Sequence, residues 1–215
     1  MSTELIQITS GRGPVECAWV AAQLVEALLV EARGAALNAE LIETEPGPEA
    51  GTLLSALIHL SGDDCAAFAA TLEGTVQWIG TSRFRPENKR KNWFVGVRRV
   101  PVPVTPVFSE RDVRIEVMRA SGPGGQHVNT TESAVRAVHV PTGLVAIARD
   151  ERSQIANRNR ALERLAILVH RSGERQLDAA RQQRWEGHDQ LERGNPIRVY
   201  EGADFRTRGG RPAGQ

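Results

Sequence analysis

One short run of the chain, Arg119–Asn129, combines backbone freedom with polar side chains. Three glycines and a proline directly precede Gln126 there. Glycine accepts positive φ and lets a main chain approach a substrate that a Cβ would block, while proline restricts its own φ. The run holds no carboxylate, and His127 is its only group that titrates near neutral pH. We therefore predict a loop that works through its backbone and presents Gln126 to a substrate.

Two common glycine-rich loops do not fit this run. A phosphate-binding loop needs a lysine after its last glycine, and none follows here. The dinucleotide-binding fingerprint needs a third glycine where His127 stands. A hairpin tip that only turns the chain remains the structural alternative, and the glycines and proline alone would favour it.

The segments around the run favour a function over that alternative. Gly124-Gly125-Gln126 lies within Ser121–Asn129 and is followed by Thr130–Arg136, by Pro141–Gly143 and by Asp150–Gln154. This series resembles the hydrolysis loop of bacterial class I peptide chain release factors. The resemblance implies insertion into the ribosomal peptidyl transferase centre, where water attacks the ester that joins the nascent peptide to P-site tRNA.

The same resemblance assigns roles to the residues of the loop. The backbone N–H of Gln126 would face the developing oxyanion or the leaving hydroxyl, and its side chain would position water and exclude larger nucleophiles. His127 is expected as a structural hydrogen-bonding residue rather than a base. In the family the matching glutamine is commonly N5-methylated, which makes Gln126 a modification site and a glutamine N5-methyltransferase a partner. The implied catalytic residues are Gly124, Gly125 and Gln126, and the residues that support the loop are Ser121, Gly122, Pro123, His127 and Asn129.

The chain differs from ordinary release factors, and these differences indicate which branch of the family it resembles. It is shorter, and Pro103–Thr105 has the letters of a stop-codon-reading tripeptide but stands in an expected linker. After Arg171 acidic residues interrupt the arginines, unlike the basic tail of small rescue hydrolases. Gly74–Ile79, Arg90–Gly96 and Glu192–Pro196 instead resemble the short homologues called release factor H. That implies codon-independent release from ribosomes with damaged decoding-centre rRNA, in association with an RtcB-type RNA ligase.

Charge is distributed unevenly along the chain, although the formal net charge is only +1. No Lys or Arg lies between Arg33 and Arg83, whereas residues 83–136 hold eleven cations and five carboxylates. A basic half beside an acidic half indicates one nucleic-acid-binding surface. Cations would contact phosphates and Trp93 would stack on an unstacked base, the alternative being a solvated loop with Trp93 in the core. The predicted rRNA-binding residues are Arg83, Arg85, Lys89, Arg90, Lys91, Trp93, Arg119, Arg136, Arg152, Arg158 and Arg160.

Hydrophobic periodicity predicts an α+β chain with two domains. In the first, strands at 5–8, 36–43, 53–60 and 75–79 alternate with helices at 15–33 and 63–72, the second capped by Asp63-Asp64. This β-α-β-β-α-β order indicates a ferredoxin-like ribosome-recognition domain over residues 1–105. Residues 93–100 would extend its sheet, and the prolines of 101–106 would form a linker.

The second predicted domain, residues 106–193, carries the hydrolysis loop. Strands at 113–118 and 134–140 flank the loop, and a third follows at 144–148. A helix capped by Ser153 and a second helical stretch at 174–192 come next. By resemblance, a strand within about 196–202 returns to the first domain. The tail 206–215, rich in Gly and Arg, is expected to be disordered.

The composition indicates where the protein resides and whether it binds a metal or a cofactor. The chain has 215 residues, 40% of them hydrophobic, and no apolar run long enough to span a bilayer. Without a leader, we expect a cytoplasmic protein with no membrane partner. Cys17 and Cys65 stand apart from other ligands and are expected as reduced, buried thiols, with no metal and no cofactor.

The expected partners are the ribosomal A site, with its 23S and 16S rRNA, and peptidyl-tRNA, and the expected state is a monomer. Two other functions stay open. One is a general rescue hydrolase indifferent to rRNA damage, and the other is a non-catalytic ribosome-binding protein. The intact Gly124-Gly125-Gln126 argues against the second.

Overall fold

The computed structural model describes residues 2–103, 105–119, 133–186 and 194–208. The chain divides into two compact units. Unit 1 comprises residues 1–102 and 182–215, and unit 2 comprises residues 103–181. Both units combine helices with sheets, so the predicted α+β class is confirmed.

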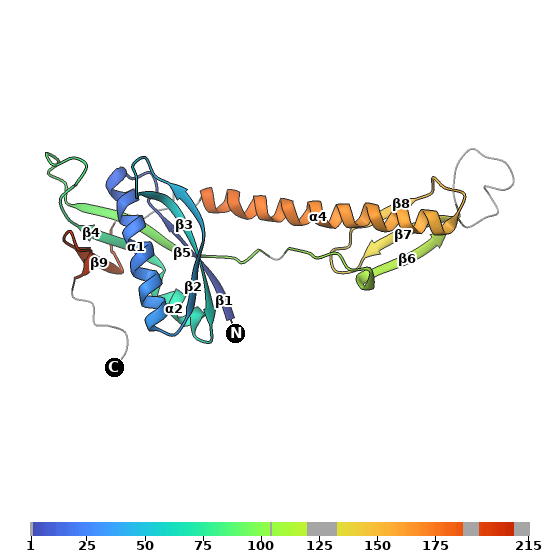
Figure 1. The fold of residues 1–215 in the computed structure, drawn as a ribbon, viewed down its shortest axis with the longest axis horizontal. Helices are drawn as coiled ribbons and strands as arrows, with labels where there is room; N and C mark the ends of the chain where they lie inside the picture. Colours follow the sequence, from blue (N-terminus) through green and yellow to red (C-terminus); the bar gives the residue numbers. More distant parts are fainter. Residues whose placement is uncertain (1, 104, 120–132, 187–193, 209–215) are drawn as a thin grey trace. The chain divides into compact units, whose positions relative to one another are not determined.

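Unit 1 is built on a seven-stranded sheet in the order β10-β9-β4-β5-β1-β3-β2. Two helices, α1 and α2, lie against one face of this sheet (Figure 1). The elements of unit 1 are β1 (Ser2–Thr9), α1 (Val15–Gly34), β2 (Asn38–Pro46), β3 (Leu53–Gly62), α2 (Cys65–Leu72), β4 (Gly74–Ile79), β5 (Asn92–Val100), β9 (Arg198–Glu201) and β10 (Arg206–Thr207).

The predicted strand 93–100, expected as an extension of the sheet, takes an internal place in it. Residues 93–100 belong to β5, which pairs antiparallel with β1. β4 lies one place farther out and pairs antiparallel with β5. The two strands therefore form a hairpin, and its connection, residues 80–91, is a loop at one end of the sheet.

The core of unit 1 lies between α1 and the sheet. β1 alternates so that Ile6 and Ile8 face this core, and α1 contributes Trp19, Leu24 and Leu28 at helical spacing. Cys17 and Cys65 are also buried here as free thiols, as expected. Asp64 stands at the N-cap of α2, but its side chain makes no capping hydrogen bond there.

The C-terminal segment of unit 1 is more ordered than the sequence predicts. β9 pairs parallel with β4, and Arg206–Thr207 form β10 against β9. The expected disorder from residue 206 onward is therefore wrong for 206–207. Phe205 explains the order, because its ring stacks on Tyr200 at 4.3 Å between centroids and packs against the core. Residues 209–215 lie outside the described part of the chain.

Unit 2 has a three-stranded antiparallel sheet in the order β6-β7-β8, packed on α4 (Figure 1). Its elements are the 3-10 turn η1 (Glu110–Asp112), β6 (Val113–Met118), β7 (Ala134–His139), β8 (Val145–Ala148) and α4 (Gln154–Glu186), of which residues 182–186 fall in unit 1. Alanines of β7 and β8 contact Ala161 and Leu165 of α4, and these small side chains allow close packing.

Helix α4 corrects the prediction of two helical stretches. It continues through Gly173 to Glu186 without a break. A single glycine costs about 1 kcal/mol in a helix interior, which good helix formers on both sides can outweigh. Residues 187–192, the remainder of the predicted second stretch, lie outside the described part.

We predict that Gly80→Ala destabilises unit 1 by about 1–3 kcal/mol, because an added Cβ would overlap the indole of Trp78. That ring cannot move freely, since its Nε1 donates to the Gly202 carbonyl at 2.9 Å and its face packs on Trp19. Urea unfolding followed by tryptophan fluorescence measures the change.

The matched control is Gly34→Ala at the end of α1, where no atom lies within 4 Å of the added Cβ. It should leave stability unchanged or raise it by up to about 1 kcal/mol. Equal midpoints for the two variants would contradict the proposed overlap.

Candidate functional site

The glycine-rich run itself falls on residues that the structure does not describe. Its predicted site residues Ser121, Gly122, Pro123, Gly124, Gly125, Gln126, His127 and Asn129 all lie outside the described ranges. The structure does describe both flanks of the run. Met118 of β6 pairs with Ala134 of β7, so residues 119–133 connect two adjacent antiparallel strands.

Asn157 ties the far flank of this connection to the start of α4. Its side chain is fully buried, and its Nδ2 donates to the carbonyls of Ser133 and Glu151, both at 2.8 Å. Its Oδ1 accepts the backbone N–H of Glu151 at 3.0 Å. One amide group thus joins the residue before β7, the segment before α4 and the first turn of α4. Ser153 contributes less, since its Oγ accepts the N–H of Ala156 only at 3.4 Å.

Two of the five predicted rRNA-binding cations of unit 2 pair with carboxylates. Arg136 bonds to Glu116, and this bond first of all lowers the pKa of Glu116. Arg160 pairs with Glu151 at 2.8 Å. Arg152 and Arg158 are exposed. Arg119 directly precedes the undescribed residues and has an interaction of its own.

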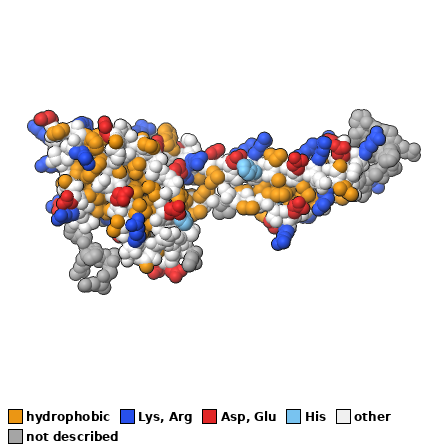
Figure 2. Space-filling view, in the orientation of Figure 1, with side chains coloured by type: hydrophobic (Ala, Val, Ile, Leu, Met, Phe, Trp, Pro, Cys, Tyr) orange, Lys and Arg blue, Asp and Glu red, His pale blue; other side chains and the backbone are white. Residues whose placement is uncertain are grey.

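In unit 1 the β4–β5 loop, residues 80–91, carries the densest group of cations. It contains Arg83, Arg85, Lys89, Arg90 and Lys91 with a single carboxylate, Glu87. All six side chains are exposed. Lys and Arg side chains gather at the end of unit 1 that carries this loop (Figure 2). The loop is therefore the candidate surface for binding a polyanion.

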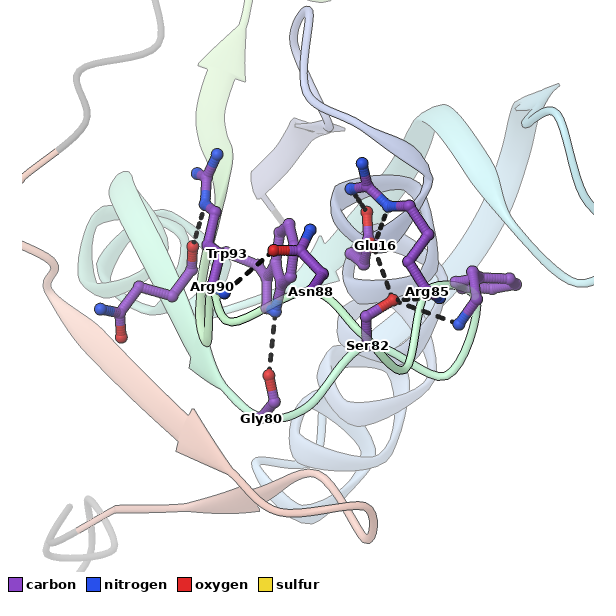
Figure 3. A network of polar contacts seen from close by, with 9 residues as sticks. Glu16, Gly80, Ser82, Arg85, Asn88, Arg90 and Trp93 are labelled. Atoms are coloured by element: carbon purple, nitrogen blue, oxygen red, sulfur yellow. Dashed lines mark hydrogen bonds and ion pairs between the residues drawn. The ribbon is translucent and has the colours of Figure 1, made fainter.

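A buried carboxylate anchors the β4–β5 loop to α1. Glu16 in the first turn of α1 points toward Ser82 and Arg85 (Figure 3). Its Oε1 accepts from Ser82 Oγ at 2.6 Å and from Arg85 Nε at 2.8 Å, and its Oε2 accepts from Arg85 Nη2 at 2.6 Å. Burial by itself raises the pKa of Glu16, but the bonds from Arg85 and Ser82 outweigh it and the pKa lies below its usual value. Glu16 is therefore ionised at neutral pH.

The one aromatic ring predicted to contact RNA is buried instead. Trp93 is 0% exposed, and its Nε1 donates to the Gly80 carbonyl at 3.0 Å. The expectation that Trp93 stacks on an unstacked base is therefore wrong, and the alternative with Trp93 in the core holds. The alternation of β5 decides this, since Trp93, Val95 and Val97 share the face that packs toward α1.

The aromatic rings restrain cationic side chains of the β4–β5 loop, because guanidinium groups lie against them. Arg90 lies 4.9 Å from the Trp93 ring centroid, and its Nε donates to the Asn92 carbonyl at 2.9 Å. Arg83 lies 5.8 Å from the Trp19 centroid and 5.9 Å from that of Phe84. Such contacts restrain a long cationic side chain at little cost in hydration.

Sequence reasoning missed Glu16, Ser82 and Asn157. Glu16 has a visible signal, since it is a lone carboxylate directly before the apolar stretch Cys17–Ala22 that begins α1. Asn157 follows the motif Asp150–Gln154 by three residues, but nothing in the sequence distinguishes it from Asn159. Burial separates the two, because Asn157 is buried and Asn159 is exposed.

The described part of the chain lacks two kinds of site. Among them, no group of three or more His, Cys, Asp or Glu is placed to hold a metal ion. None of the helices that the structure describes is long and apolar enough to cross a membrane.

The chain is similar to known proteins along most of its length. Residues 104–207 match the family described as RF-1 domain. A protein of Escherichia coli named peptide chain release factor homolog is 40% identical over 203 residues, which cover 94% of this chain and 98% of the relative. Peptide chain release factor RF2 of Thermus thermophilus is 37% identical over 185 residues, 82% of this chain but 48% of the relative. A solved structure of RF2 of Thermus thermophilus aligns with a TM-score of 0.47 at 33% identity, over 93% of this chain and 57% of that one.

We predict that Asn157→Leu destabilises β7 and β8 by about 3 kcal/mol, because it leaves three buried backbone groups without partners. The amides of residues 134–148 should then exchange with solvent faster, by about a hundredfold. Hydrogen exchange followed by mass spectrometry measures this.

Asn159→Leu is the matched control, since it makes the same change two residues along α4 on the exposed side. Its exchange rates should equal those of the parent chain. Similar protection in both variants would show that the Asn157 amide is dispensable.

Proposed function

The chain belongs to the peptide chain release factor family, and from that premise we propose that it releases nascent peptides from ribosomes by hydrolysing the peptidyl-tRNA ester. The observation that supports this most is the 40% identity to the Escherichia coli relative across almost the full length of both chains. Gly124-Gly125-Gln126, between two paired strands, would supply the reacting loop. The chain spans about half the length of Thermus thermophilus RF2, so the activity of that longer protein comes to it only as a proposal.

The proposed reaction needs few groups from the protein. Water adds to the ester carbonyl and loses a proton, the bond from the carbonyl carbon to the ribose oxygen breaks, and the ribose oxygen takes up a proton to become a hydroxyl while the peptide leaves with a free carboxyl group. The backbone N–H of Gln126 would stabilise the oxyanion or the leaving oxygen, a role in which one donor contributes about 3 kcal/mol. The run Arg119–Asn129 carries no carboxylate to act as a base. Ribosomal RNA would therefore complete the site, exclude bulk water and orient the ester.

We further propose that release does not depend on a stop codon. Pro103–Thr105 belongs to the segment between β5 and η1, not to the tip of a loop in unit 1. The β4–β5 loop, which joins adjacent strands of the unit 1 sheet, holds cations instead of such a tripeptide. These cations favour contacts with phosphates, which carry no sequence information.

The β4–β5 loop supports a proposal about the substrate as well. Its cations would bind rRNA in the decoding centre of the small subunit, and a break in that rRNA would give them access to phosphates. Because Trp93 is buried, the contact would run through phosphates rather than through a stacked base. A cytoplasmic monomer acting in the A site, an N5-methyltransferase for Gln126 and an RtcB-type RNA ligase complete the proposal.

We predict that Gly125→Ala lowers the rate of peptide release by about 100- to 1,000-fold, because it disturbs the backbone that presents the Gln126 N–H. Gln126→Ala should retain more activity but lose selectivity for water over a larger nucleophile such as hydroxylamine. Single-turnover release from purified ribosomes measures both rates and both products. An equal loss in the two variants, with selectivity unchanged, would contradict the backbone role.

We also predict faster peptide release from ribosomes nicked in the decoding-centre rRNA than from intact ones, with no stop codon present. Reversal of Lys89, Arg90 and Lys91 to Glu should abolish that preference, because it replaces attraction to phosphates by repulsion. Single-turnover release at equal factor concentration compares the two substrates. Equal rates on both ribosomes would instead support a general rescue hydrolase, and no release on either a non-catalytic binding protein.

The control reverses Arg171, Arg175 and Arg181, three exposed cations of α4 that change the net charge by the same amount. It should keep the preference for nicked ribosomes. If both triple variants lose it alike, total charge and not the β4–β5 loop is responsible.

A further inference from the structure

The Glu16 side chain is buried, although a carboxylate at this position of a helix could equally be exposed to solvent. A carboxylate in the first turn of a helix is stabilised by the helix dipole even when exposed. The Glu16 side chain is only 1% exposed, and burial of a charge is costly unless it is paired and hydrogen-bonded. Its three side-chain hydrogen-bond donors belong to two residues of the β4–β5 loop, Ser82 and Arg85. Glu16 therefore gains these hydrogen bonds when that loop adopts the observed conformation.

The loop is shaped around the same contacts. The Oγ of Ser82 donates to Glu16 and accepts the backbone N–H groups of Phe84 and Arg85, at 3.2 and 2.8 Å. This closes the turn from 82 to 85. The Oδ1 of Asn88 then accepts the N–H of Arg90 at 3.0 Å, and the Asn88 N–H bonds to the Arg85 carbonyl at 3.0 Å. Two successive turns thus extend from the Glu16 anchor to Arg90.

The three arginines of the loop differ in whether they pair with a carboxylate. Arg85 uses Nε and one terminal nitrogen on Glu16, in the two-bond geometry that Arg and carboxylate favour. All three guanidinium groups lie within 6 Å of the centroid of an aromatic ring, but in the described part of the chain Arg83 and Arg90 form no ion pair with a carboxylate. Their charges remain available, and their side chains are already restrained. A restrained cation loses less entropy when it binds.

We propose that Glu16 is a positioning residue for RNA binding: it holds the β4–β5 loop through Ser82 and Arg85, so that Arg83 and Arg90, and not Arg85, contact RNA phosphates. The inference rests on the proposed function, since it takes rRNA as the partner of this loop. It assigns Arg85, which the sequence counts among the RNA-binding cations, to the internal structure of the loop. It also separates the three arginines of the loop into two that contact phosphate and one that does not.

The direction in which one substitution changes the affinity for RNA tests the role of Glu16. If charge alone mattered, Glu16→Gln would tighten binding to a polyanion, because it removes a negative charge near the surface. An anchor predicts the opposite, a loss of about tenfold, because the neutral amide binds Arg85 less strongly and frees the loop. Glu87→Gln removes the same charge from an exposed position of the same loop and should bind as tightly as the parent chain or tighter.

The experiment measures the affinity of fluorescently labelled full-length protein for purified ribosomes nicked in the decoding-centre rRNA. If Glu16→Gln binds as tightly as Glu87→Gln, the anchor is overturned. Peptide release at saturating factor provides a second readout. Glu16→Gln should shift the concentration of half-saturation and leave the maximal rate unchanged, whereas a protein that is merely less stable would release less peptide at saturation.

The salt dependence of binding tests the division among the arginines. Each phosphate contact contributes about 0.7 to 0.9 to the slope of log affinity against log salt concentration. Arg83→Met and Arg90→Met should each reduce the slope by about that amount. The double variant Glu16→Gln/Arg85→Met, which leaves no buried charge unpaired, should weaken binding without changing the slope. A slope reduced as much as in Arg83→Met would make Arg85 a phosphate contact and overturn the division.

Two measurements keep the test independent of folding and of catalysis. Ser82→Ala removes one anchor bond without changing any charge, and it should weaken binding in the same direction as Glu16→Gln even if the latter folds poorly. Hydrogen exchange should show faster exchange of the Phe84 and Arg85 amides in both variants.

Parent protein that binds nicked ribosomes but releases no peptide would overturn the proposed function and not the inference. Parent protein that does not bind them would overturn both.

Discussion

The pairing of β5 between β1 and β4 is the constraint on which unit 1 depends. β5 joins two strands that lie far apart in sequence, and its inward side chains Trp93, Val95 and Val97 complete the core under α1. The same pairing fixes both ends of residues 80–91, because these residues connect β4 to β5. A loop with five cations would otherwise repel itself into many conformations. Held at both ends and at Glu16, it keeps one arrangement, in which Arg83 and Arg90 lie against buried rings.

Each unit uses one buried polar side chain to hold a segment that lacks regular structure. Glu16 joins α1 to the β4–β5 loop, and Asn157 joins α4 to Ser133 and Glu151. Both side chains are buried, and both would destabilise the fold if their hydrogen bonds were missing. Only the native path of the neighbouring segment supplies their hydrogen-bond partners. Each side chain therefore disfavours other conformations of that segment. The two segments are also those to which the proposed function assigns RNA binding and the approach to the reacting glutamine.

The proposed chemistry fits this distribution of polar groups. A chain that acts on its own needs a base, an acid or a metal beside its substrate, whereas residues 119–129 hold glycines, amides and one histidine. Such a loop can contribute backbone donors and shape, and the ribosome would contribute the rest. The protein's own folded parts then serve to bring the loop to the right place, and binding specificity would reside in unit 1. The 40% identity with the Escherichia coli release factor homolog extends across both units, in keeping with a single function that needs them together.

The sequence by itself determined what depends on neighbours along the chain. The glycine-rich run and the motifs after it identified the family, and the periodicity of Val15–Arg33 and of the strands identified the α+β class, because both signals are local. Local signals also misled, since they predicted two helical stretches where α4 is continuous and disorder from residue 206 where β10 forms. Only the tertiary structure decided that β5 is internal, that Trp93 is buried, and that Glu16 and Asn157 serve as anchors. Glu16 lies 66 residues before Ser82, and Asn157 lies 24 residues after Ser133. Contacts at such separations arise from sheet pairing and packing, which no short stretch of sequence specifies.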